Sequence, residues 1–166
     1  LYWMECEPTR AEEQASVPTR WRRCHACGMT FDDEEYLARE YHCPSCGTLN
    51  RLGAQDRIDL ILDDGIMEEW DTDLADADPL QFPGYVEKLD AQRSKTGLHE
   101  GVRTGYGHIG RVPVAFGVMD CGFFMGSMGS YVGEKIARLF DRATEQGLPV
   151  VLFCTSGGAR MQEGLA

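Results

Sequence analysis

The sequence contains no long hydrophobic run. None of its apolar stretches approaches the roughly 18 residues that a membrane-spanning helix needs, so we expect no such helix. Its first residues, LYWMECEPTR, have neither an initiator Met nor the layout of a signal peptide. Because the chain also stops two residues after a glycine-rich segment, we expect it to be a fragment of a longer chain.

Basic residues are also scarce. Lys and Arg number 16 against 27 Asp and Glu, which gives a formal net charge of −11. A surface that binds nucleic-acid phosphates needs clustered Lys and Arg, so the composition argues against nucleic acid as the main partner. Hydrophobic residues make up 43% of the 166 residues. That content favours a globular chain with one ordinary domain, or with a small domain and part of a larger one.

Cysteine, in contrast, is plentiful and regularly spaced. Four of the seven form two Cys-x2-Cys pairs with 15 residues between the pairs: Cys24, Cys27, Cys43 and Cys46. Thiolates spaced in this way on tight turns can complete a tetrahedral shell around one metal ion. Gly28 and Gly47 directly follow the pairs and allow backbone amides to approach the sulfurs. We predict a structural Zn²⁺ ion with no open coordination position.

Two alternatives to this four-cysteine site remain. A disulfide framework is disfavoured because the count is odd and the other three cysteines are scattered: Cys6, Cys121 and Cys154. His25 and His42 lie close to the cysteines and could replace one of them as ligand.

The expected zinc ribbon could also bind nucleic acid, since RWRR at residues 20–23 is basic. Residues 20–57, however, contain six Arg and six acidic residues, so the ribbon is neutral. Nucleic-acid binding is therefore the minor alternative.

After the ribbon the periodicity indicates two helices. Residues 54–65 place Ile58, Ile61 and Leu62 on one stripe, and residues 83–97 begin with Pro and end with Gly. The acidic, proline-containing segment between them predicts mostly loop.

From about Val102 the pattern is that of a βα core. Two strand-like runs meet at a turn around Gly110, and a helix is expected at 131–146 with Ser130 as its N-cap. The apolar stripe of this helix consists of Val132, Ile136, Leu139, Phe140 and Ala143. VVLFC then predicts a buried strand of a parallel sheet. The fold class is therefore α/β, built from a ββα-type unit.

Two glycine-rich turns lie between strands and helices, MGSMGS (125–130) and CTSGGARMQEG (154–164). Glycine leaves backbone N–H groups uncovered, and a following helix points its positive dipole end outward. Such a turn can bind an anion or a developing oxyanion. The alternative is that the glycines only permit tight turns and close packing.

FFMGSMGSYVGEK and LFCTSGGARMQEG together closely resemble the carboxyltransferase beta subunit family of bacterial and plastid acetyl-CoA carboxylase. In that family a four-Cys zinc ribbon precedes a crotonase-like carboxyltransferase domain. The resemblance runs from about Trp21 to the last residue, and Met125 departs from members that have a glycine there. It implies a ribbon at 20–52, a helical connector at 53–100 and the first part of the carboxyltransferase core at 101–166, and it leaves the N-terminal extension at 1–19 unassigned.

The resemblance also implies a reaction. The carboxyl group of carboxybiotin, carried on the biotin carboxyl carrier protein, moves to the methyl carbon of acetyl-CoA and gives malonyl-CoA for fatty acid synthesis. Backbone amides around Gly157, Gly158 and Ala159 would supply one side of a hole for the thioester oxyanion. The turn made of Gly126, Ser127, Met128 and Gly129 would line the CoA site. Arg160 would meet a CoA phosphate, or would pair with nearby acids.

In this family the thioester hole takes its second amide from another glycine-rich turn, which we expect beyond Ala166. The resemblance further implies a carboxyltransferase alpha subunit as partner in an α2β2 assembly, and a cytoplasmic or plastid-stromal location with no membrane contact. We therefore expect the 166-residue chain to be inactive alone. The alternatives are a zinc-ribbon module that binds nucleic acid or protein, and a different acyl-CoA carboxyltransferase or decarboxylase.

Overall fold

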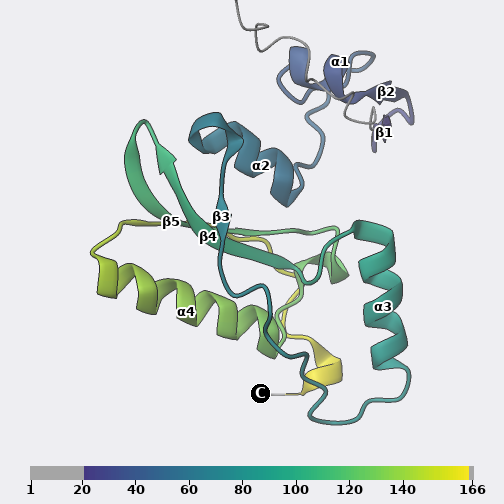
Figure 1. Ribbon diagram of the computed structural model, residues 1–166. Coiled ribbons are helices and arrows are strands. Elements are labelled where there is room, and N and C mark those ends of the chain that lie inside the picture. The colour runs from purple at the N-terminus through teal and green to yellow at the C-terminus, as the bar shows by residue number, and fades with distance from the viewer. Residues whose placement is uncertain (1–20, 165–166) are drawn as a thin grey trace, which may run out of the picture. The chain divides into compact units, whose positions relative to one another are not determined.

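The computed structural model describes residues 21–164, which form two compact units divided between Arg51 and Leu52 (Figure 1). Residues 53–100, for which we expect a helical connector, lie in the same unit as the residues that follow them. Within the described residues, no helix is both long and apolar enough to cross a membrane.

The first unit is a small ribbon. Strands β1 (Trp21–Arg23) and β2 (Thr30–Asp32) pair antiparallel, and helix α1 (Asp33–Ala38) follows. The Asp32 carboxylate caps α1 by accepting the Glu35 N–H at 2.8 Å. Three buried aromatic rings form the small core of this unit: Phe31 stacks on Tyr36, and Tyr41 meets Tyr36 edge to face. The sequence analysis did not predict α1.

The second unit is built on a four-stranded sheet with the order β3-β4-β5-β6. Strands β3 (Glu68–Glu69), β4 (Val102–Ile109) and β5 (Val112–Met119) are antiparallel, and β6 (Val150–Phe153) runs parallel to β5. Gly110 and Arg111, both with positive φ, make the two-residue turn between β4 and β5. The α/β class, the hairpin and the parallel last strand are all confirmed.

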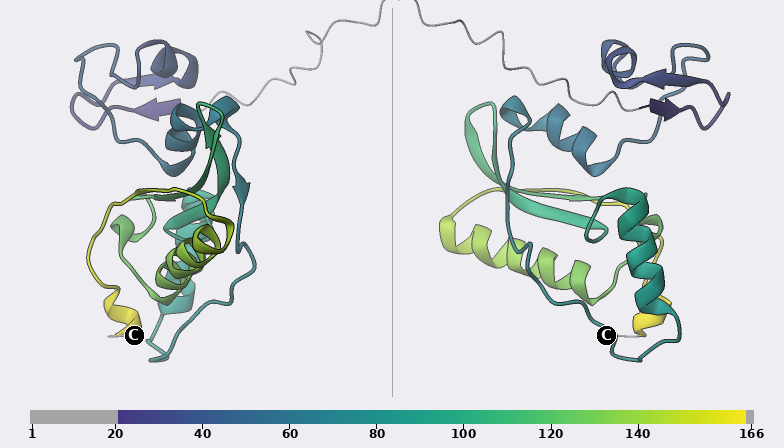
Figure 2. Two further views of the ribbon diagram at one scale, coloured as in Figure 1. Left: turned by 90° about the vertical axis from the view of Figure 1, so that its left-hand side faces the viewer. Right: turned by 45° about the vertical axis from the view of Figure 1, so that its right-hand side comes forward.

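Two helices cover the opposite faces of this sheet (Figure 2). Helix α2 (Ala54–Ile61) packs Ile58 on Val114, Phe116 and Val118, whereas helix α4 (Ser130–Gln146) packs Leu139 on Ala115. Strand β5 is therefore buried on both faces, which explains its continuous apolar sequence.

Helix α3 (Tyr85–Thr96) ends at Gly97 in the left-handed conformation, as its sequence predicted. At its first turn it lies against the last described residues, because the Tyr85 hydroxyl bonds the Glu163 carboxylate. Three 3-10 turns complete the unit: η1 (Asp63–Gly65), η2 (Phe124–Gly126) and η3 (Met161–Glu163).

The segment between the helices is mostly loop, as predicted, and its short strand β3 pairs with β4. Three predicted details are wrong. The first helix ends at Ile61, not near Gly65. Phe140 is 47% exposed, and the buried side of α4 instead includes Lys135, whose ammonium pairs with Glu69 at 3.2 Å. The N-cap of α4 is Gly129 rather than Ser130.

Candidate functional site

The two glycine-rich turns lie side by side at the end of the sheet. The Met128 N–H donates to the Gly158 carbonyl at 2.9 Å, and the Arg160 N–H donates to the Met128 carbonyl at 2.8 Å. These bonds form a parallel bridge between Met128 and Ala159. Both turns that the sequence singled out, 125–130 and 154–164, therefore form one structure.

Glycine is required where the turns touch. A Cβ at Gly126 would lie 3.0 Å from the Thr155 carbonyl oxygen, and one at Gly157 would lie 3.0 Å from the Met125 carbonyl oxygen. Backbone packs against backbone at both points, which a side chain would prevent. The packing explanation for the glycines thus applies at Gly126 and Gly157.

The amides of the second turn differ in their bonding. The Gly158 N–H donates to the Ser156 hydroxyl at 3.0 Å. Within residues 21–164, the Gly157 and Ala159 N–H groups donate to no protein acceptor. These two donors are the ones that a ligand oxygen can use.

A cleft of about 580 Å³ lies beside these amides. Its walls are the turn from Gly122 to Ser127, the segment from Gly157 to Gln162, and the α3 side chains Gln92 and Lys95. A cleft of this size can hold part of a small-molecule ligand. The exposed Lys95 ammonium gives one wall a positive charge.

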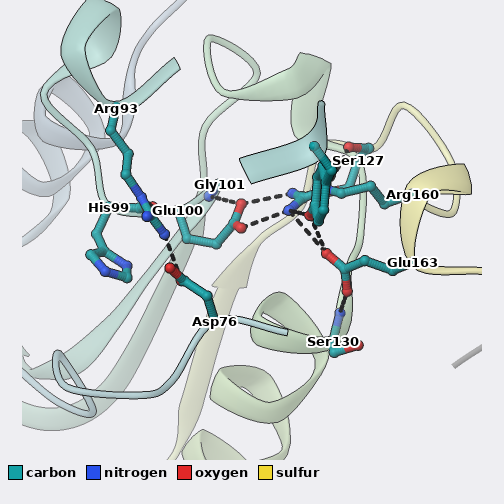
Figure 3. Close-up of polar contacts among 10 residues, drawn as sticks. Asp76, Arg93, His99, Glu100, Gly101, Ser127, Ser130, Arg160 and Glu163 are labelled. Atoms are coloured by element: carbon teal, nitrogen blue, oxygen red, sulfur yellow. Dashed lines mark hydrogen bonds and ion pairs between the residues drawn. The ribbon is translucent and has the colours of Figure 1, made fainter. Parts of the chain in front are cut away.

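Arg160 follows the second turn and is only 2% exposed. Its guanidinium makes a two-point ion pair with Glu100, at 2.6 and 2.7 Å (Figure 3). Burial lowers the pKa of Arg160, but the Glu100 and Tyr85 contacts outweigh burial and raise it, so the group is always charged. Two roles were predicted for Arg160, binding a CoA phosphate and pairing with nearby acids. The contacts of its guanidinium are those of the second role.

Glu163 joins the same cluster. Its carboxylate accepts the Ser130 N–H at 2.5 Å, accepts a short hydrogen bond from the Tyr85 hydroxyl, and lies 3.4 Å from Arg160. A Cβ at Gly129 would lie 2.3 Å from the Glu163 carboxylate. Glu163 therefore caps α4 and occupies the space that a residue other than glycine would need.

Sequence reasoning missed Glu100, Glu163 and Tyr85. Glu163 had one available signal, because it lies three residues after Arg160, the spacing of an ion pair within one helical turn. Glu100 and Tyr85 had none, since they lie far from Arg160 in the sequence.

The helix predicted after the second turn is a single 3-10 turn, η3, in the described residues. A three-residue turn has almost no macrodipole, because the dipole sums over aligned peptides. Any anion binding at this site therefore depends on the individual amides.

The four predicted cysteines come together in the ribbon. All four sulfurs lie within 4.8 Å of one another, with Cys24–Cys46 at 3.7 Å and Cys27–Cys43 at 3.6 Å. A tetrahedral shell with Zn–S distances of about 2.3 Å has sulfur–sulfur edges of about 3.8 Å, so the geometry fits zinc. None of the six described cysteines forms a disulfide.

The backbone around each cysteine pair is the same. The Gly28 N–H donates to the Cys24 carbonyl and the Gly47 N–H to the Cys43 carbonyl, and both glycines have positive φ. His25 and His42 are not part of the cluster: His25 bonds Asn50, and His42 bonds the backbone carbonyls of residues 39 and 40. The histidine alternative is thus not adopted.

The cluster also shifts the acidity of its thiols. The Met29 N–H lowers the pKa of Cys27, but burial and the neighbouring thiols raise it to about 11. Hydrogen bonds with the Thr48 side chain and N–H lower the pKa of Cys46 to about 6. Four thiolates at these distances repel one another, and a cation between them removes that repulsion.

The chain is similar to known proteins over most of its length. A sequence model described as carboxyl transferase domain matches residues 48–166. The chain is 48% identical over 160 residues to the acetyl-coenzyme A carboxylase carboxyl transferase subunit beta of Desulforamulus reducens. That match covers 96% of this chain, ribbon included, but only 56% of the relative, so the chain spans little more than half the relative's length.

Two solved structures have a similar fold over most of this chain. Transcarboxylase 12S with hydrolysed methylmalonyl-coenzyme A bound matches 80% of this chain and 22% of its own, with a TM-score of 0.57 and 25% identity. A single-chain, multi-domain long-chain acyl-CoA carboxylase matches 70% of this chain and 12% of its own, with a TM-score of 0.55 and 26% identity. The resemblance drawn from the two glycine motifs is confirmed.

Proposed function

The chain belongs to the carboxyl transferase domain family, and from this we propose that it carries the carboxyltransferase beta function of an acetyl-CoA carboxylase. The reaction moves a carboxyl group from carboxybiotin, on the biotin carboxyl carrier protein, to the methyl carbon of acetyl-CoA. The carboxyltransferase alpha subunit is the proposed partner, in an α2β2 assembly. We place the reaction in the cytoplasm, or in the plastid stroma for a plant protein.

The observation that carries this proposal is the pair of unbonded amides at Gly157 and Ala159 beside the cleft. Removing a proton from the acetyl methyl group places negative charge on the thioester oxygen. Fixed N–H donors stabilise that charge without acting as competing acids. Gly158 permits the turn through its φ of +93° and donates to Ser156, so Gly157 and Ala159 are the proposed donors.

We assign the first turn, Gly126 to Gly129, to the wall of the acyl-CoA site. Ser127 lines the cleft, whereas Gly126 packs against Thr155 and Gly129 against Glu163. The five donors of Arg160 are occupied, so we assign a CoA phosphate to Lys95 instead. Lys95 lies on the exposed side of the same cleft.

In the ribbon we propose a structural Zn²⁺ held by Cys24, Cys27, Cys43 and Cys46. A closed shell of four thiolates leaves no position for a substrate, so the ion would stabilise the fold. The ribbon also favours acetyl-CoA as the substrate. The alignment with the beta subunit of an acetyl-CoA carboxylase extends over the ribbon residues of this chain. A different acyl-CoA carboxyltransferase remains the second candidate, since the compared structures act on other acyl-CoA compounds.

The test uses the full-length protein assembled with its alpha subunit and carboxylated carrier protein. Labelled carboxyl transfer is measured to acetyl-CoA, propionyl-CoA and methylmalonyl-CoA in parallel. We expect the highest kcat/KM with acetyl-CoA. A preference for a longer acyl group would support the second candidate, and no transfer to any thioester would contradict both.

A further inference from the structure

Arg160 is bonded to the first glycine turn twice, through different parts of the residue. Its backbone N–H donates to the Met128 carbonyl at 2.8 Å. Its guanidinium donates to the Ser127 carbonyl at 2.9 Å and lies 3.2 Å from the Ser127 hydroxyl. Two bonds to adjacent residues hold Arg160 against the first turn. The Met128 N–H then donates to the Gly158 carbonyl at 2.9 Å, which orients the peptide that carries the Ala159 N–H.

The far side of the guanidinium is anchored to the sheet. Both oxygens of Glu100 bind it, and the N–H of Gly101, the residue directly before β4, donates to Glu100 at 2.7 Å (Figure 3). A planar two-point pair of this kind allows little rotation of either side chain. The turn is therefore held relative to the sheet rather than only to the neighbouring loop.

All five N–H donors of the guanidinium have acceptors. Nε faces the Ser127 hydroxyl, one terminal nitrogen donates to Glu100 and Tyr85, and the other donates to Glu100 and the Ser127 carbonyl. An arginine has five donors and no acceptor, so nothing remains for a phosphate. This exhausts the capacity of Arg160 to bind substrate directly.

We propose that Arg160 is a positioning residue, which with Glu100 fixes the separation of the two glycine turns and thereby the direction of the Ala159 N–H. This inference rests on the proposed function of that amide. Glu163 supports the same arrangement by joining the N-terminus of α4 to Tyr85 of α3. Arg160 acts on the reaction only through the backbone bridge.

The test compares Arg160→Lys with Lys135→Met in the full-length assembled enzyme. Lysine keeps the charge but cannot bind Glu100 and Ser127 together in the planar arrangement. Lys135 is the matched control, because it is equally buried, pairs with Glu69, and contacts neither glycine turn. Glu100→Asp is the second variant, which keeps the charge and shortens one arm of the pair.

We expect Arg160→Lys to lower kcat by about a hundred-fold, the effect of misplacing a catalytic group by about 1 Å, with KM for acetyl-CoA nearly unchanged. Glu100→Asp should lower kcat in the same way, and the double variant should be no worse than the poorer single one. Lys135→Met should lower thermal stability and leave kcat intact. A raised KM with normal kcat in Arg160→Lys would instead identify a phosphate ligand, and unchanged values would identify plain packing.

Amide hydrogen exchange separates this inference from the proposed function. The N–H groups of Met128 and residue 160 should exchange faster in Arg160→Lys than in the unmodified protein or Lys135→Met. That difference would be measured even if the unmodified protein transferred no carboxyl group. Equal exchange in all three proteins would contradict the positioning role, whatever the activity.

Discussion

Gly158 combines a φ of +93° with open space around the position of a Cβ. A Cβ there meets no described protein atom within 4 Å other than its chain neighbours, so we expect the effect of valine to come from backbone strain and from turning the neighbouring amides. Gly157 is different, because its Cβ position is occupied by the other turn. Adjacent glycines thus serve different purposes in one segment.

We predict that Gly158→Val lowers the turnover of the full-length enzyme by about a hundred- to a thousand-fold, the usual effect of losing one oxyanion donor. Zinc content should stay normal, because the ribbon is a separate unit. Steady-state kinetics on the assembled enzyme, with thermal unfolding measured beside it, provides the check.

Gly147→Val is the matched control for strain. Gly147 also has positive φ and open space, but it ends α4. The Gly147→Val enzyme should lose about as much thermal stability as the Gly158→Val enzyme and should keep the turnover of the unmodified enzyme. Equal turnover in both variants would mean that the second turn has only a packing role.

At the scale of elements, α4 shows what a local sequence pattern can and cannot predict. Its length, its glycine stop and most of its apolar stripe follow from periodicity and are confirmed. Its cap does not follow, because the acceptor is Glu163, 33 residues later. The burial of Lys135 could not be predicted for the same reason. It depends on an ion pair with Glu69, which lies on a two-residue strand within an acidic segment whose sequence is typical of a loop.

The cap predicts how stability changes with pH. Burial raises the pKa of Glu163, but hydrogen bonds from Tyr85 and Ser130 outweigh it, and the pKa lies below its usual value of 4.5. The folded pKa is lower than the unfolded one, so this stabilisation is complete above about pH 4.5 and is lost as the pH falls through the folded pKa. Glu163→Gln should be less stable than the unmodified protein at pH 7, and the difference should shrink below pH 4.5.

Urea unfolding at a series of pH values measures this difference, followed through the helical signal. Glu134→Gln is the control, since Glu134 forms only an exposed pair with Arg138 on the same helix. A constant difference between Glu163→Gln and the unmodified protein from pH 7 to pH 3 would contradict the assignment.

For the molecule as a whole, the two units should lose their structure independently. We predict about one tightly held Zn per chain, and we predict that Cys43→Ser releases it and unfolds the ribbon, because structural zinc supplies much of the folding energy of such small units. Elemental analysis and limited proteolysis measure both effects, and α4 should stay protected.

Cys154→Ser controls for the loss of a thiol, since Cys154 lies outside the cluster. It should leave zinc content unchanged. Metal-free protein with an intact ribbon would contradict the zinc assignment.

The 166-residue chain by itself should form no malonyl-CoA from carboxybiotin and acetyl-CoA. The chain aligns with only 56% of the length of the beta subunit it matches. We propose that the thioester hole takes a second amide from a turn outside these 166 residues, and that carboxybiotin binds together with the alpha subunit. Product formation by the isolated chain, measured by mass spectrometry, would show that one turn is sufficient.

Most of the molecule could be predicted from motifs whose partners are close in sequence. Spacing alone identified the cysteine pairs, the Gly110 turn and the two glycine segments, because the conformation of each depends on residues that are neighbours in the sequence. The cluster around Arg160 could not be found in this way, because its members come from four segments and meet only in the folded chain.

The same cluster has a consequence for the order of folding. The β4–β5 hairpin closes through a two-residue turn, whereas Arg160 and Glu100 are 60 residues apart and Glu163 caps a helix begun 33 residues earlier. Contacts between distant residues form late, because the chain must lose more entropy before they are made. The sheet should therefore assemble first and the wall of the cleft last, so that during synthesis α4 has no cap until Glu163 has left the ribosome.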